Sequence, residues 1–452
     1  MTPHRMRQQI LEGDVVRTLL KLSAPLIFTQ LVQILYNLVD TFWLGRLGRA
    51  AVSAPAVAWP IVFTVTMFGG GFATAGLALV SQYVGANKWE RVDKVVGNLL
   101  VLLGALSIVF GVLGYVFTPQ ILHLLRIPED VIPEAATYLR IIFASLPFSF
   151  VVFVFSMVLR AVGDMWTPTK INLATITLNA ILDPVLIFGW LGAPAMGVAG
   201  AAIATALSNA VASMVSLVIL FKGWKHIHVR LEHLIPDGSL ISKIVSIGTP
   251  AGLSNSLNGL AFTTIMAIVS AFGSVAVAAY GIGMRIINIV SAVAFGMSQA
   301  ASVMIGQNIG AEQYERAKHI LATTIKITFS TMSVLALVVF ALRYDLIEIF
   351  ISDPAVINTG AMLLFYFSLS VPFFGIFFPV MNALRAAGKT KISATLAFVR
   401  LWVFRVGLAY LLGRAWGSVN GVFLGMALSN VLGGLLSLYF VFWTGWMKKI
   451  ID

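Results

Sequence analysis

The sequence predicts an all-α polytopic membrane protein with about twelve transmembrane helices, in two six-helix lobes related by a parallel pseudo-two-fold repeat. Three observations support this fold class: the composition, a series of long apolar stretches, and an internal repeat. The chain has 452 residues, of which 59% are hydrophobic and only 11% are charged. A soluble protein of this size would need far more charge on its surface.

The apolar stretches are each long enough to cross a bilayer as a helix, because a span needs about 20 residues. In the first half they lie at 17–44, 52–83, 94–117, 133–159, 168–188 and 195–221. In the second half they lie at 242–271, 275–308, 317–342, 356–384, 392–412 and 418–446. We therefore expect an N-terminal lobe at 1–222, a charged cytoplasmic linker at 223–241 and a C-terminal lobe at 242–452.

The two halves match when Pro25 is placed on Pro250 and both are followed forward without a gap. The polar loops SQYVGANKWER and GQNIGAEQYER then fall in register. Shared composition would give scattered Gly and Ala matches, but it would not hold one register through polar loops. Because each half has an even number of spans, both halves start on the same side of the membrane, as in a parallel repeat.

The net charge of +12 is explained by membrane topology, and we expect no nucleic-acid partner. With an even number of spans, both termini lie on one side, and that side would hold most of the Lys and Arg residues. The opposite side would hold few: Arg46, Arg49, Arg126, Arg343 and Arg414. Because basic residues concentrate in cytoplasmic loops, we expect cytoplasmic termini in a multi-pass protein of the cell membrane.

Sequence motifs for enzyme chemistry are absent: there is no P-loop, no GxSxG and no HExxH. The chain has no cysteine, which excludes disulfides and thiol chemistry. We expect no enzymatic activity and no cofactor. The linker contains three histidines that could bind a metal, although a solvated linker is the simpler interpretation: His226, His228 and His233.

Asp40 stands inside the first apolar stretch, where an ionisable group is costly unless it is neutralised or paired. The residues before it, at spacings of three and four, form one polar stripe on a helix: Gln30, Gln33 and Asn37. Tyr36 lies one turn away. Interhelical hydrogen bonding would account for the amides, but not for an acid, so we predict a functional role for Asp40.

Asp183 stands inside the fifth stretch, with Asn179 one turn before it and Pro184 directly after it. Proline removes a backbone donor and usually kinks a helix, which frees carbonyl oxygens near the carboxylate. Hard cations prefer such oxygen ligands. A kink capped by Asp183 is the structural alternative, but an acid at this depth favours a functional role.

The two acids are predicted to lie at the same depth. Asp40 is six residues before Arg46, and Asp183 is six residues before Gly189, each near the outer end of its span. At 1.5 Å per residue, both lie about 9 Å from that end. They can therefore meet in the outer half of the N-terminal lobe, where a proton or Na⁺ would relieve their repulsion.

The second half has neither acid, because Ile265 and Phe404 occupy the corresponding positions. It has basic residues in or near its spans instead: Arg285, Lys326, Arg400 and Arg405. Some of these are expected to extend to the membrane surface. Arg285 would either line a central cleft or form a structural pair.

The chain resembles the multidrug and toxic compound extrusion (MATE) transporters, with archaeal members of the DinF-like branch as the nearest match. The resemblance is based on YNLVDTFWLGRLG in the first span, LNAILDP in the fifth and LRAVGD after the fourth. It implies two lobes around a V-shaped cleft. It also implies a secondary active antiporter that exports cationic amphipathic drugs by alternating access, in exchange for H⁺ or Na⁺.

The resemblance also implies roles for individual residues. Cation or proton binding is assigned to Asp40, Asp183, Asn179 and Asn37. The substrate cavity is assigned to Gln33, Tyr36, Tyr138, Ser156 and Arg285. Conformational change is assigned to Pro25 and Pro184.

Two positions depart from the family pattern. Ala201 stands where the family has a hydroxyl on the sixth span, and Ser156 stands where it has an amide on the fourth. Thr205, one turn after Ala201, could complete a Na⁺ site with Asp40, Asn179 and Asp183. These departures weaken the case for Na⁺ coordination more than the case for protonation.

An alternative function is a flippase for lipids or lipid-linked sugars of the same superfamily, in which three basic residues would bind phosphates: Arg285, Arg400 and Arg405. A channel or receptor fits poorly with two internally repeated lobes. The expected partners are small cationic or amphipathic substrates and the lipid bilayer, and we expect a monomer.

Overall fold

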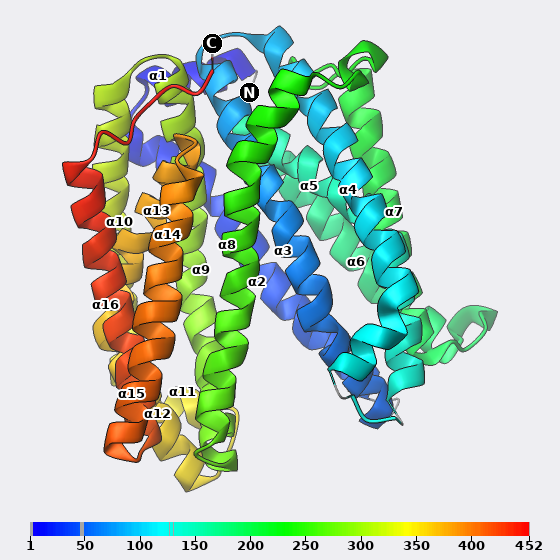
Figure 1. The fold of residues 1–452 in the computed structure, drawn as a ribbon, viewed down its shortest axis with the longest axis vertical. Helices are drawn as coiled ribbons and strands as arrows, with labels where there is room; N and C mark the ends of the chain where they lie inside the picture. The colour runs from blue at the N-terminus through cyan, green and yellow to red at the C-terminus, as the bar shows by residue number, and fades with distance from the viewer. Residues whose placement is uncertain (1–2, 46–48, 126, 130, 452) are drawn as a thin grey trace. The chain divides into compact units, whose positions relative to one another are not determined.

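The computed structural model contains twelve helices long and apolar enough to cross a membrane, within the residues that it describes, 3–45, 49–125, 127–129 and 131–451. This confirms the predicted all-helical class and number of spans (Figure 1). The side chains of Asn37 and Asp40 lie outside what the structure describes, so the predictions that concern them stay predictions.

The spans of the first half are α2 Val15–Gly45, α3 Arg49–Gly85, α4 Trp89–Leu124, α5 Ile132–Ala161, α6 Trp166–Phe188 and α7 Gly197–Lys222. Several extend beyond the predicted stretches, because hydropathy marks only the apolar part of a helix and polar turns continue it at either end. A short helix that was not predicted, α1 Pro3–Glu12, precedes them, and the 3₁₀ turns η1 Trp190–Gly192 and η2 Leu231–Leu234 flank α7.

The second half begins with α8 Gly238–Ser270, α9 Ser274–Gly310, α10 Tyr314–Ala341 and the short α11 Arg343–Glu348. The tenth span consists of α12 Pro354–Ser370, the 3₁₀ turn η3 Val371–Phe373 and α13 Phe374–Ala386. The eleventh consists of α14 Thr390–Phe398, the π-helix η4 Val399–Val406 and α15 Gly407–Trp416. The last span is α16 Val419–Trp443.

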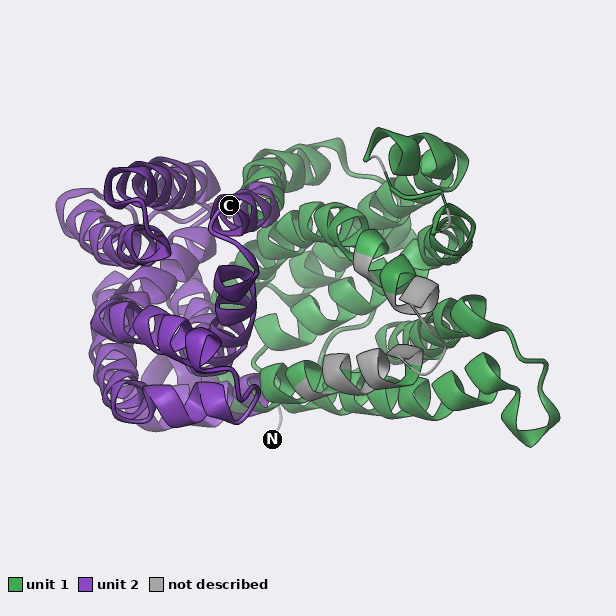
Figure 2. Cartoon of the chain, turned by 90° about the horizontal axis from the view of Figure 1, so that it is seen from below, with its two compact units in different colours: residues 1–7, 28–256 green, residues 8–27, 257–452 purple. Residues whose placement is uncertain are grey.

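The chain forms two compact units (Figure 2). Unit 1 contains residues 1–7 and 28–256, and unit 2 contains residues 8–27 and 257–452. These bounds differ from those of the predicted lobes, because α2 and α8 are each divided between the units. Within unit 1, the first part of α8 packs tightly on α3, since a Cβ atom at Gly71 would lie 2.0 Å from the backbone nitrogen of Gly252.

Most residues of the linker after α7 are exposed, as expected for a solvated segment, but a few of them attach it to the rest of unit 1. The side chain of His233 is only 7% exposed, and its backbone carbonyl meets α4 so closely that a Cβ atom at Gly97 would lie 2.1 Å from it. The backbone N–H of Asp237 donates to the side-chain oxygen of Asn98 at 2.7 Å. The linker packs closely because its own apolar residues, Ile227 and Val229, are fully buried.

Asp164, which follows α5, attaches the linker through an ion pair with Lys225 at 2.5 Å. Burial disfavours the charged carboxylate, but hydrogen bonds from Lys225 and Thr167 outweigh it and hold the pKa of Asp164 below its ordinary value. The carboxylate therefore stabilises the folded protein when it is ionised.

We expect Asp164→Asn to lower the stability of the purified protein by about 1–3 kcal/mol at neutral pH, because a buried charge-assisted hydrogen bond is lost. A group with a lowered pKa contributes fully above its unfolded pKa, so the difference from wild type should shrink as pH falls below about 4. Thermal melting across a pH series measures both effects. Glu232→Gln, which changes an exposed acid of the same linker, should leave the melting temperature unchanged; an equal loss in both variants would contradict this account.

Candidate functional site

Asn179 is the centre of a polar cluster in unit 1, formed by side chains from α2, α6 and α7. Its side-chain oxygen accepts a hydrogen bond from the hydroxyl of Tyr36. Its side-chain nitrogen donates to Asp183 Oδ1 at 3.4 Å and to Thr205 Oγ1 at 3.4 Å. The structure thus brings together four residues with predicted roles. Asn179 and Asp183 were predicted to bind the ion, Thr205 to complete a Na⁺ site and Tyr36 to line the cavity.

Asp183 is completely buried and Asn179 is 3% exposed. Both lie on α6, which continues through Pro184 and ends at Phe188, where Gly189 adopts a left-handed conformation with φ of 76°. Because Pro184 has no amide hydrogen, the carbonyl of Ala180 lacks its helical donor and lies one turn from the carboxylate. Asp183 is therefore a buried carboxylate close to a backbone carbonyl that has no helical donor.

Hydrogen bonds between described side chains join α2 to α6 at two levels. The hydroxyls of Thr29 and Thr169 lie 2.9 Å apart, and two turns further along α2 the Tyr36 hydroxyl donates to Asn179. Any change in the charge of Asp183 will therefore alter a polar network that connects two spans.

An apolar cluster closes one side of this site. Ile187 and Ala201 are buried at its centre, and Trp43, Tyr138 and Phe188 pack around them. The rings of Trp43 and Phe188 lie 6.1 Å apart. Ala201 thus contributes to an apolar wall at the position where the family pattern has a hydroxyl.

The other residues predicted for the cavity are more dispersed. Gln33 on α2 and Ser156 on α5 are half-buried, and Arg285 on α9 is exposed within unit 2. Pro25 is buried in the part of α2 that belongs to unit 2, two residues before the division at Ile27. No group of three or more metal-ligating residues occurs in the described part of the chain, so the linker histidines do not form a metal site there.

Unit 2 contains a buried pair of arginines that the sequence only partly predicted. Arg400 and Arg405 are 6% and 4% exposed, so these two are not among the basic residues that extend to the membrane surface. Both donate to the side-chain oxygen of Asn430, at 3.2 and 2.7 Å. Arg405 also donates to Ser429 at 3.3 Å. Asn430 in turn donates to Ser370 at 3.0 Å.

The π-helix η4 explains how the two arginines meet. Residues five apart point in different directions on an α-helix, whereas the i to i+5 hydrogen bonds of a π-helix place them one turn apart. The guanidinium of Arg400 also lies 4.3 Å from the ring centre of Phe377. Among the described residues, no acid lies within ion-pair distance of Arg400 or Arg405.

The arginine pair occupies the place in the second half that the acid site occupies in the first. Later in the repeat, where the second half is four residues shorter, Ala206 aligns with Ala427. In the same register Arg400 aligns with Asn179, and Arg405 aligns with Pro184. The sequence signal for Asn430 as the shared acceptor was its place in the Ala-Leu-Ser-Asn segment that both halves contain.

A family model described as MatE matches residues 25–185 and 250–411, two segments that begin at the residues from which the repeat was aligned. The probable multidrug resistance proteins YoeA and YpnP of Bacillus subtilis are 29% and 31% identical to the chain. They cover 97% and 92% of it, over 96% and 93% of their own lengths. A protein of Shewanella oneidensis named FAD transporter is 28% identical over 96% of each chain.

Solved structures share the fold. The MATE transporter VcmN of Vibrio cholerae in its bent form has a TM-score of 0.86 with 24% identity, covering 94% of this chain and 95% of that one. A MOP superfamily transporter from Pyrococcus furiosus has a TM-score of 0.88 with 22% identity, covering 95% and 96%. The curated relatives named above are bacterial, so they do not support the expected archaeal DinF-like branch.

Asn430→Leu should lower the melting temperature of the purified protein by several degrees, because both guanidinium groups lose their shared acceptor in a buried place. Asn209→Leu is the matched control, since Asn209 is the counterpart of Asn430 in the first half and no arginine of the described part of the chain bonds to it. Thermal melting followed by tryptophan fluorescence measures the difference. Equal losses in the two variants would show that the shared acceptor has no special role.

Proposed function

The chain belongs to the MatE family of membrane transporters, and on this premise we propose that it is a secondary active multidrug exporter. It would move cationic amphipathic compounds out of the cell in exchange for H⁺ or Na⁺, by alternating access. The observation that supports this most directly is the completely buried carboxylate of Asp183 on a membrane-spanning helix. Such a group is costly unless a cation or a hydrogen-bonding partner neutralises it, so its presence favours ion coupling.

The cluster centred on Asn179 contains carboxylate, amide and hydroxyl oxygens, which are ligand types that a small hard cation prefers. As placed, however, Asn179 directs its NH₂ group to Asp183 and its oxygen to Tyr36. Coordination of Na⁺ by both residues would require the amide to turn over, whereas a proton on Asp183 requires no such change. We therefore propose H⁺ as the coupling ion, with Asp40 as a second acid in the same site.

Coupling requires that the ion and the drug favour different conformations. Protonation of Asp183 converts its charge-assisted hydrogen bond with Asn179 into a weaker neutral one. Because Asn179 also holds Tyr36, this change weakens the connection between α6 and α2. Bending of α2 near Pro25 would then alter the cavity and release the drug.

A flippase for lipids or lipid-linked sugars is the alternative, and the arginine pair of unit 2 favours it. Arginine binds phosphate oxygens through two parallel hydrogen bonds, and no described acid neutralises Arg400 and Arg405. One relative is named FAD transporter, and FAD is a phosphate-bearing anion. Export of cations without anions would exclude this alternative.

Asp183→Asn should reduce proton-driven export at least tenfold, because the only described carboxylate of the site is lost. The measurement is movement of a fluorescent cation across proteoliposomes, with pH and Na⁺ gradients imposed separately. Asp345→Asn changes an exposed acid and serves as the control. Wild-type transport by Asp183→Asn would refute ion coupling at this site, and transport driven by Na⁺ alone would refute the choice of H⁺.

Tyr36→Phe should reduce proton-driven export by about fivefold while leaving the melting temperature nearly unchanged, because one hydrogen bond of about 1 kcal/mol is removed from Asn179. Tyr410→Phe removes a hydroxyl that accepts from Arg414 on an exposed surface, and it should transport as wild type. If both variants transport equally well, the connection between Tyr36 and Asn179 plays no part in coupling.

A further inference from the structure

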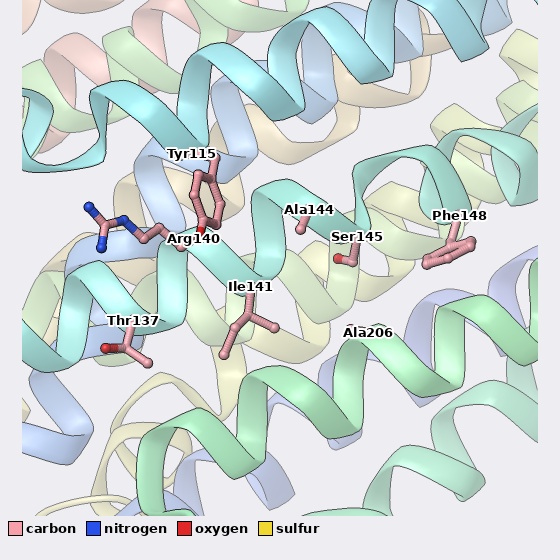
Figure 3. A pocket seen from close by; sticks show the side chains of 8 residues that line it. All are labelled: Tyr115, Thr137, Arg140, Ile141, Ala144, Ser145, Phe148 and Ala206. Atoms are coloured by element: carbon pink, nitrogen blue, oxygen red, sulfur yellow. The ribbon is translucent and has the colours of Figure 1, made fainter.

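A groove of about 430 Å³ lies on unit 1 where α4, α5 and α7 meet (Figure 3). Its one charged side chain is at one end, where Arg140 lies beside Tyr115 and Thr137, and a further polar side chain, Ser145, lies along the groove. Its other end is apolar and reaches Phe148. From 137 to 148, the groove follows α5 for about 16 Å, at 1.5 Å per residue.

Arg140 has hydrogen-bonding capacity that the described part of the chain does not use. Its guanidinium lies 5.5 Å from the ring centre of Tyr115, and its Nε is buried without a hydrogen-bond partner. No described acid lies within ion-pair distance of it. A buried donor without an acceptor is costly, so this arginine favours a ligand that brings acceptors and negative charge.

The packing of α4 on α5 does not itself require the positive charge of Arg140. In the register of the repeat, Tyr115 aligns with Phe340, Arg140 with Phe365, and Thr137 with Met362. Phe340 and Phe365 pack directly on each other in unit 2, with ring centres 5.9 Å apart. The second half thus makes the same helix contact with apolar rings, which indicates that Arg140 serves something other than packing.

The groove is flanked by apolar side chains that face away from the protein. Val112 and Val116 on α4 are 57% and 54% exposed, and Leu207 and Val211 on α7 are both 46% exposed. Arg140 is eight residues after the start of α5, or about 12 Å along the helix. An arginine at this depth can extend towards the membrane surface, where lipid head groups lie.

We propose that this groove binds one phosphate-bearing membrane lipid. The phosphate accepts hydrogen bonds from Arg140, and the Tyr115 hydroxyl supplies a further donor. An acyl chain follows α5 past Ile141 towards Phe148. The Thr137 hydroxyl donates to the carbonyl of Pro133, so it lines the polar end without donating to the phosphate. This inference goes beyond export and does not depend on it.

The test is native mass spectrometry of the full chain, delipidated in detergent and supplied with phosphatidylglycerol or with diacylglycerol of the same acyl chains. Wild type should retain one phosphatidylglycerol and at least tenfold less diacylglycerol. The double variant Tyr115→Phe/Arg140→Phe, which copies the contact of the second half, should lose at least tenfold of the bound phosphatidylglycerol. Its melting temperature should stay within a few degrees of wild type.

Arg343→Gln is the matched control, because Arg343 also lies over aromatic rings, 4.8 Å from that of Phe340 and 4.9 Å from that of Tyr344, but does not line this groove. It should bind phosphatidylglycerol as wild type does. Undiminished binding by the double variant, or equal binding of the two lipids, would overturn the proposal. Asp183→Asn should keep lipid binding whatever its effect on transport, so the two proposals can fail separately.

Discussion

A charge inside the membrane-spanning part of a protein must find its partners within the protein, and this constraint governs both units. The hydrocarbon interior of a membrane offers no hydrogen bonds, so each ionic group buried in the protein needs hydrogen bonds, an opposite charge or a bound ion. In unit 1, Asp183 is held by Asn179, which connects three helices. In unit 2, two arginines are held by one asparagine, and one of them, Arg400, also lies over aromatic rings.

In the internal repeat, the acid site around Asp183 and the arginine pair lie at corresponding positions and carry opposite charge. The shared helix arrangement therefore determines where a polar cluster can form, whereas individual side chains determine whether the cluster is negatively or positively charged. The acid site lies on a helix that contains proline, and the basic site lies on a π-helix. Both irregularities free the backbone from ideal helical geometry near the polar groups, which suits the assembly of a site within an otherwise apolar span.

Much of this arrangement could be predicted from the sequence, because long apolar stretches and polar residues one turn apart are local signals. They located the twelve spans and the pairing of Asn179 with Asp183. The contact of Asn179 with Thr205 needed a family pattern in addition, since it joins distant helices. The π-helix could not be predicted, because Arg400 and Arg405 are five residues apart and α-helical periodicity separates them. The contacts that attach the linker at Ile227, Val229 and His233 were also not predicted, since a charged segment with Pro236 and Gly238 has the composition of a solvated loop.

The π-helix has a mechanical consequence. It contains one residue more per turn than an α-helix would need, so its conversion to α-helical form would turn α15 by about 100° around its own axis relative to α14. Arg405 would then leave the face that meets Asn430. The hydrogen bonds to Asn430 therefore oppose rotation of α15 about its axis. They help to fix which face of α15 packs against α16.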